Sequence, residues 1–172
     1  MKQNFQQRDT MNIDENVFRL FGKKIDNPFI DEILDSLSCV VDSTKRKDWN
    51  KKFQNSIITK GWKKEFRLPK TYVFDFFKEN EQCVVAIEVE LSNDAAFHRD
   101  IIKFMTFKEI TKCEKDMLGV IIVHSDETQK QMITRNNKIG NGSILYKKAS
   151  EILQNLDSIL VQLNIAITLI GK

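Results

Sequence analysis

The chain has 172 residues, of which 41% are hydrophobic and 30% charged, and its formal net charge is +3 at pH 7. This length and composition predict a globular domain with a real hydrophobic core, and they leave no linker, internal repeat or low-complexity segment. We therefore expect one domain over residues 1–172. Residues 1–24 are the least patterned part and should form a loose arm or a lone helix.

Membrane proteins and disulfide-rich proteins do not fit this sequence. The N-terminal segment lacks the apolar core of a signal peptide, and no apolar run approaches the roughly 18 residues of a membrane span. We expect a soluble cytoplasmic protein with no membrane partner. The cysteines, Cys39, Cys83 and Cys113, are far apart and lack C-x-x-C spacing, so we expect small hydrophobic side chains in the core rather than disulfides or a zinc site.

The first part of the chain is predicted to be helical. Asn27 followed by Pro28 is a helix start, and apolar residues then recur at helical spacing as far as Val41. A second helix should begin at Asp48 and stop at Gly61. From there the period changes to that of strands, in the segments WKKEFRL, TYVFDFFK and CVVAIEVEL.

The second half alternates helices with strands. A third helix, Asp94 to Thr111, leads to the buried strand MLGVIIVH, and a long polar segment follows from residue 125 to residue 143. A fourth helix around Tyr146 to Leu163 leads to a last strand, IAITLIG. The order of elements predicts an α/β fold in which helices flank both faces of a mixed central β-sheet.

A basic tract covers residues 45–70, where ten Lys or Arg residues accompany only two acids, Asp48 and Glu65. The rest of the chain is net acidic. Such a tract is suited to a polyphosphate partner, because each neutralised phosphate releases counterions. A solvated helix face in a Lys-rich protein explains it equally well.

Three carboxylates are predicted to converge on a hairpin. The second and third predicted strands should pair around the turn ENEQ, with Asp75 opposite Ala86. Because cross-strand neighbours share a face, Asp75, Glu88 and Glu90 would then lie together.

Converging carboxylates repel one another and are costly to desolvate unless a cation or a shared proton neutralises them. Oxygen-only ligands select a hard cation, usually Mg²⁺. The other residues of this face, Val73, Phe77, Val84 and Ala86, are not those of a solvated face. A magnesium site is therefore predicted here, and a merely solvated hairpin face is the alternative.

The segments FDFF, VVAIEVELSN and FHRDIIKF resemble the catalytic region of the PD-(D/E)xK nucleases, and more narrowly the BglII and BamHI group of type II restriction endonucleases. The similarity covers about Trp49 to Gly171, and the E-x-E-x-S-N segment is its most specific part. It implies a restriction-endonuclease-like core and Mg²⁺-dependent hydrolysis of double-stranded DNA by a homodimer at a short palindromic site.

By this resemblance, Asp75 and Glu88 would hold one or two Mg²⁺ ions, and Glu90 would orient or deprotonate the attacking water. Glu90 stands where most of the superfamily has Lys. Since it cannot supply positive charge, a second metal or the basic tract must do so. The resemblance also implies a polar residue from the preceding helix region, for which Asn55 and Glu65 are the candidates.

DNA reading is assigned to Ser92 and Asn93, which follow the catalytic strand directly. Residues at the matching positions of the group read a site centred on GATC, and Asn can pair with adenine in the major groove. Capping of the third helix is their alternative role. Arg135, Asn136 and Asn137 in the polar segment, together with Thr134, would read the remaining positions.

The third helix is the expected dimer interface, because it carries more apolar residues than one buried face needs: Phe97, Ile101, Phe104, Met105 and Phe107. Arg99 and Lys103 of this helix could reach phosphate, although a solvated helix face is the simpler expectation. Two other functions remain open. One is a repair or junction-resolving nuclease of the same superfamily, and the other is a catalytically silent module that binds DNA or a protein partner.

Overall fold

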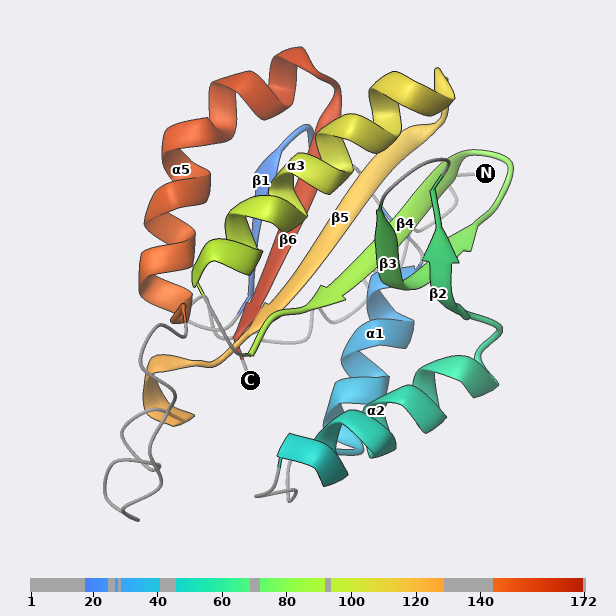
Figure 1. Cartoon of the computed structure of the whole chain (residues 1–172), viewed down its shortest axis with the longest axis vertical. Coiled ribbons are helices and arrows are strands. Elements are labelled where there is room, and N and C mark those ends of the chain that lie inside the picture. Colours follow the sequence, from blue (N-terminus) through green and yellow to red (C-terminus); the bar gives the residue numbers. More distant parts are fainter. Residues whose placement is uncertain are drawn as a thin grey trace, which may run out of the picture.

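The computed structural model describes residues 18–24, 27, 29–40, 46–68, 72–91, 94–128 and 144–171. Within these ranges the strands are β1 (Phe18–Gly22), β2 (Lys63–Arg67), β3 (Val73–Glu79), β4 (Cys83–Val89), β5 (Asp116–Val123) and β6 (Ile165–Gly171). The helices are α1 (Phe29–Ser38), α2 (Arg46–Thr59), α3 (Asp94–Thr111) and α5 (Tyr146–Gln162) (Figure 1). None of these described helices combines the length and the hydrophobicity needed to cross a membrane.

The strands form one sheet in the order β1-β6-β5-β4-β3-β2. β4, β5 and β6 are parallel and lie in the middle of the sheet. β1 at one edge, and β2 and β3 at the other, run antiparallel to their neighbours. Helical crossovers join the parallel strands, as parallel pairing requires. The predicted α/β class with a mixed sheet is confirmed.

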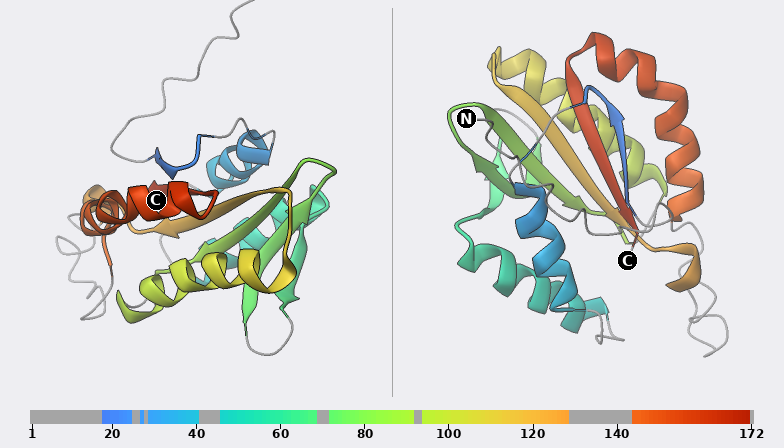
Figure 2. Two further views of the ribbon diagram at one scale, coloured as in Figure 1. Left: turned by 90° about the horizontal axis from the view of Figure 1, so that it is seen from above. Right: turned by 180° about the vertical axis from the view of Figure 1, so that it is seen from behind.

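Helices cover both faces of the sheet, and Figure 2 shows α1 and α3 on opposite sides of it. α3 and α5 pack on one face around Phe104 and Leu153, which are fully buried. α1 and α2 pack on the other face around Ile33 and Phe53. Because both faces are covered, the central strands are almost continuous apolar runs. A charged residue in such a run therefore marks a special position.

Phe18–Gly22 is an edge strand paired with β6, where a loose arm or a lone helix was expected. Its last residue, Gly22, has a φ of +77°, and a Cβ there would lie 2.3 Å from the carbonyl oxygen of Ile165. Glycine alone fits this close approach. Residues 1–17 lie outside the described residues, so the expectation for them stays a prediction.

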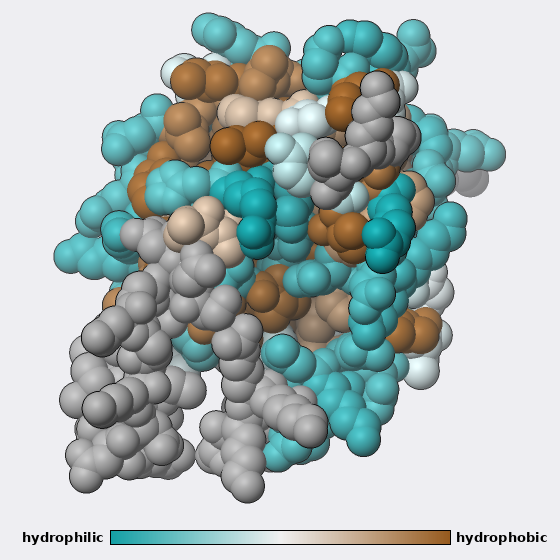
Figure 3. Space-filling view, viewed as in Figure 1, coloured by the Kyte–Doolittle hydropathy of each residue, from teal (hydrophilic) through white to brown (hydrophobic). Residues whose placement is uncertain are grey.

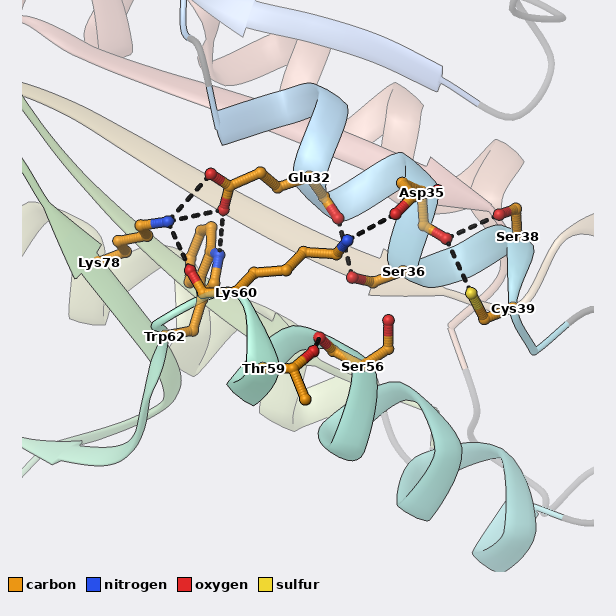
Figure 4. A network of polar contacts seen from close by, with 10 residues as sticks. All are labelled: Glu32, Asp35, Ser36, Ser38, Cys39, Ser56, Thr59, Lys60, Trp62 and Lys78. Atoms are coloured by element: carbon orange, nitrogen blue, oxygen red, sulfur yellow. Dashed lines mark hydrogen bonds and ion pairs between the residues drawn. The ribbon is translucent and has the colours of Figure 1, made fainter.

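Helix α1 is fixed to the outer strands by a network of polar contacts (Figure 4). Its Glu32 carboxylate accepts hydrogen bonds from Trp62 Nε1 and Lys78 Nζ, both at 2.8 Å. Lys78 Nζ also donates to the carbonyl oxygen of Lys60 at 2.7 Å and lies 4.8 Å from the centre of the Phe29 ring. α1 therefore links β3 to the connection between α2 and β2.

The cysteines differ in their environments. Cys83 is buried in the core as expected, whereas Cys113 is half-buried and Cys39 is exposed. The expectation that Cys39 lies in the core is wrong, because it follows the last turn of α1 on the outer side. All three are free thiols.

Candidate active site

The candidate site lies where β3 and β4 separate. Their ladder ends at the pair Phe76 and Ile87. Beyond it, the Val89 N–H donates a hydrogen bond to Asp75 Oδ2 at 2.9 Å. A side-chain carboxylate therefore stands where a regular hairpin would place a backbone acceptor, and it holds Asp75 at the end of β4.

The hairpin register differs from the prediction by two residues. Ala86 pairs with Phe77, whereas Asp75 was expected there. The cause is Asn80, whose Oδ1 accepts a hydrogen bond from the Cys83 N–H at 2.8 Å. This bond fixes the centre of the turn one residue later in the chain than predicted. Because side chains alternate with a period of two, this shift leaves the predicted face unchanged.

Strand β3 also changes face at Asp75. Phe74 stacks on Phe104 of α3, whereas Phe76 contacts Phe53 of α2 on the other side of the sheet. Side chains two residues apart share a face in a regular strand. The alternation is therefore interrupted at Asp75, which lets its carboxylate reach across to β4.

Glu88 and Glu90 are buried at the carboxyl end of β4, with exposed fractions of 3% and 8%. The alternative of a solvated carboxylate face is therefore wrong. Glu88 Oε1 accepts a hydrogen bond from Lys103 Nζ of α3 at 2.8 Å. The same Nζ forms an ion pair with Asp100 Oδ1 at 2.9 Å. Helix α3 thus adds an acid and a base to the three predicted carboxylates.

Asp100 and Lys103 are site residues that the sequence reasoning missed. A solvated helix face was expected for Lys103, yet Lys103 is 7% exposed and Asp100 only 2%. The segment FHRDIIKF held a usable signal. Asp100 lies one turn from both Phe97 and Phe104, so an acid and a base three residues apart sit within an apolar stripe.

The charges of this group act strongly on one another. Burial raises the pKa of Glu88, and the carboxylates of Asp100 and Asp75 raise it further, while Lys103 lowers it. Burial likewise raises the pKa values of Asp75 and Asp100. Burial lowers the pKa of Lys103, but Glu88 and Asp100 outweigh it, so the net shift is upward. The group holds more carboxylates than its one ammonium can neutralise.

The donors of this group suit a hard divalent cation. Asp75, Glu88 and Glu90 offer only carboxylate oxygens, which Mg²⁺ and similar ions prefer. Within the described part of the chain, no three His, Cys, Asp or Glu side chains converge closely enough to hold an ion. In this arrangement Glu88 is hydrogen-bonded to Lys103. The donor chemistry of these carboxylates fits a divalent metal ion.

The two candidates for an auxiliary residue are both exposed. Asn55 lies on α2, and Glu65 lies on β2 with a φ of 53°. Glu65 is close enough to Asp75 for its charge to raise the pKa of that residue. Of the two, Glu65 is therefore the one with an interaction at the site.

The residues assigned to DNA reading, Ser92, Asn93, Arg135, Asn136 and Asn137, lie outside the described residues. Their roles stay predictions. The structure does describe Glu90, which precedes Ser92 and Asn93 in the chain. The Glu90 N–H donates to the carbonyl oxygen of Ile122 at 2.9 Å, so the last carboxylate of the site is anchored on β5.

The apolar residues proposed for a dimer interface are mostly core residues of the described structure. Four of them are at most 4% exposed and pack between α3 and the sheet: Phe97, Ile101, Phe104 and Phe107. The argument from these residues is therefore wrong. The exposed apolar side chains of α3 are Ile102 and Ile110, at 50% and 44%.

The basic tract lies beside the site. Its exposed members in the described residues are on α2 and β2: Lys51, Lys52, Lys63, Lys64 and Arg67. β2 pairs with β3, which carries Asp75, so the tract borders the carboxylates. In Figure 3 the surface over α2 is largely hydrophilic.

The mixed six-stranded sheet with flanking helices is a restriction-endonuclease-like fold. The family model described as restriction endonuclease BglII/BglIII matches residues 27–171. The chain therefore belongs to this family of DNA-cleaving hydrolases, whose members use divalent metal ions. The predicted resemblance is confirmed.

A solved structure shows the same fold. The crystal structure of restriction endonuclease BglII complexed with a DNA 16-mer matches with a TM-score of 0.65 and 19% sequence identity. The match covers 90% of this chain and 75% of that chain. A comparison with proteins of curated function gives no match.

Protonation and metal binding should compete at this site. The raised pKa values of Asp75, Glu88 and Asp100 mean that the folded chain keeps protons which the unfolded chain releases above about pH 4. Without metal, stability should therefore fall as the pH rises through these raised pKa values. Mg²⁺ should oppose this fall, because its ligands must be deprotonated.

The measurement is the melting temperature of the chain with and without about 10 mM Mg²⁺, a concentration high enough to occupy a weak site. The stabilisation by Mg²⁺ should be larger at pH 8 than at pH 6, and it should disappear in the double variant Asp75→Asn, Glu88→Gln. An equal Mg²⁺ effect at both pH values would contradict the assignment.

Proposed function

We propose that this chain is a type II site-specific deoxyribonuclease that hydrolyses double-stranded DNA at a short palindromic site. The observation that carries the proposal is the burial of Glu88 and Glu90 at the end of β4. Beside them, the Asp75 carboxylate of β3 accepts a hydrogen bond from the Val89 N–H of β4. Membership of the restriction endonuclease BglII/BglIII family supports the same reaction class.

Each acidic residue has a role in this proposal. Asp75 and Glu88 come from adjacent strands and would hold one or two Mg²⁺ ions. A bound Mg²⁺ supplies a water of lowered pKa and neutralises charge on the scissile phosphate. Glu90 lies directly after β4, and its charge raises the pKa of Asp75, so it would orient or deprotonate the attacking water. Glu65 would act as the auxiliary residue in preference to Asn55.

DNA would be held by charge and read by short polar side chains. The basic tract on α2 and β2 would follow the phosphates, since it borders the site on the edge strand. Ser92 and Asn93 would read base edges in a site containing GATC. The segment with Arg135, Asn136 and Asn137 would read the flanking positions.

The active form would be a cytoplasmic homodimer. One site cuts one strand, and a two-fold dimer places one site on each strand of a palindrome. Helix α3 remains the proposed interface. Its exposed Ile102 and Ile110, rather than its buried aromatic residues, are the apolar side chains available for it.

Replacing Asp75 with Asn or Glu88 with Gln should abolish Mg²⁺-dependent cleavage. The single-turnover rate should fall about 10³-fold or more, the scale expected when a metal ligand is lost. DNA affinity without metal should stay within about threefold, because the basic tract is untouched. Glu81→Gln, an exposed carboxylate in the β3–β4 turn, is the matched control and should cut normally. Wild-type turnover by either site variant would rule out the assignment.

Digestion of a DNA of known sequence should give discrete fragments whose ends map to sites containing GATC. Replacing Asn93 with Ala should relax or abolish this pattern, since a bidentate contact to adenine is worth about 1–3 kcal/mol of discrimination. Gln162→Ala, at the exposed end of α5, is the control and should leave the fragments unchanged.

Other outcomes of the digest separate the remaining functions. Ends unrelated to GATC would rule out the proposed site, and an unchanged pattern for Asn93→Ala would rule out its role. Cleavage of branched or damaged DNA alone would indicate a repair or junction-resolving nuclease. Binding without cleavage under any divalent metal would indicate a silent module.

A further inference from the structure

Strand β4 carries Glu88, is followed by Glu90 and has no Lys or Arg, so it brings no positive charge to the site. Helix α3 supplies one instead. Lys103 Nζ lies 2.8 Å from Glu88 Oε1 and 2.9 Å from Asp100 Oδ1. Both carboxylates and the ammonium are buried.

This ion pair differs from an ordinary helix pair. Glu109, in the last turn of the same helix, and Lys112, which directly follows the helix, are also three residues apart, but their side chains are 78% and 74% exposed. Lys103 and Asp100 are buried, and Lys103 reaches beyond its own helix to a strand. Burying such charges costs free energy that apolar side chains would not cost. Stability of the helix therefore does not explain the arrangement.

We propose that Lys103 is a positioning residue of the active site. Its ammonium would bind the Glu88 carboxylate when no metal is present and would release that carboxylate when a divalent ion binds. Asp100 then keeps Lys103 in place, and the ammonium remains as a positive charge near the scissile phosphate. This inference rests on the proposed function and adds to it the source of positive charge that Glu90 cannot provide.

Two cations competing for one carboxylate have a measurable consequence. Lys103 lowers the pKa of Glu88, so the chains are compared at a pH at which Glu88 is ionised. There, removing the ammonium leaves Glu88 available to the metal and takes away a like charge, so the metal should bind more tightly. The same change removes positive charge from the neighbourhood of the phosphate, so cleavage should slow. A residue that only supports the fold would not produce tighter metal binding together with slower cleavage.

The test compares the full chain with Lys103→Met, Lys103→Arg and the control Lys112→Met. Mn²⁺, which takes the same oxygen ligands as Mg²⁺, is titrated without DNA and followed by electron paramagnetic resonance. Lys103→Met should bind Mn²⁺ about tenfold more tightly, while Lys103→Arg and Lys112→Met stay within about threefold of the wild type. At saturating Mg²⁺, Lys103→Met should cut DNA about 100-fold more slowly, Lys103→Arg should recover part of that loss, and Lys112→Met should cut normally.

Equal or weaker Mn²⁺ binding by folded Lys103→Met would overturn the proposal, as would full cleavage by that variant. If Lys103→Met does not fold, Lys103→Met combined with Asp100→Asn is compared with Asp100→Asn alone, since the two differ only in the ammonium. Tighter Mn²⁺ binding by the double variant supports the proposal, and equal binding overturns it. A wild-type chain that binds Mn²⁺ but leaves DNA uncut refutes the proposed nuclease function, while the Mn²⁺ comparison still decides the role of Lys103 in holding Glu88.

Discussion

The hydrogen bond from the Val89 N–H to the Asp75 carboxylate is the contact on which the site depends. This bond lies just beyond the last pair of the β3–β4 ladder, at the end away from the turn, and it places a carboxylate beside Glu88. The aromatic residues on either side of Asp75 pack on opposite faces of the sheet, which fixes β3 in this irregular course. The two hydrophobic cores therefore set the course of β3, and the hydrogen bond to Val89 then fixes the Asp75 carboxylate beside β4.

A second constraint is the burial of that acidic group under α3. Carboxylates held together away from water must share protons or attract cations. Lys103 supplies one positive charge from within the chain. The carboxylates outnumber this single ammonium, so a second cation could still be neutralised here. Protonation of the site, and with it any binding of a divalent ion there, should therefore depend on pH. In the proposed function, the exposed basic residues on the neighbouring edge strand would attract DNA phosphates.

Much of this architecture could be predicted from the sequence, for physical reasons that differ between elements. β4 and β6 are covered on both faces, so their unbroken apolar runs identify them, and Glu88 stands out within such a run. β1 could not be recognised, because a five-residue edge strand is defined by its pairing with β6, which is remote in sequence. The hairpin register was wrong by two residues because the side chain of Asn80, not the length of the turn, fixes it. Lys103 was missed because exposed apolar residues of α3 such as Ile102 obscure its buried face, although Asp100 lies one turn from both Phe97 and Phe104.

The most direct test of the account is a crystal structure of the chain with Mn²⁺ and DNA, using the anomalous signal of the ion. The account predicts an anomalous peak in contact with carboxylate oxygens of both Asp75 and Glu88, with Lys103 Nζ beyond hydrogen-bonding distance of Glu88 and still paired with Asp100. An anomalous peak elsewhere, or an ion bound while the contact between Lys103 and Glu88 remains intact, would contradict it.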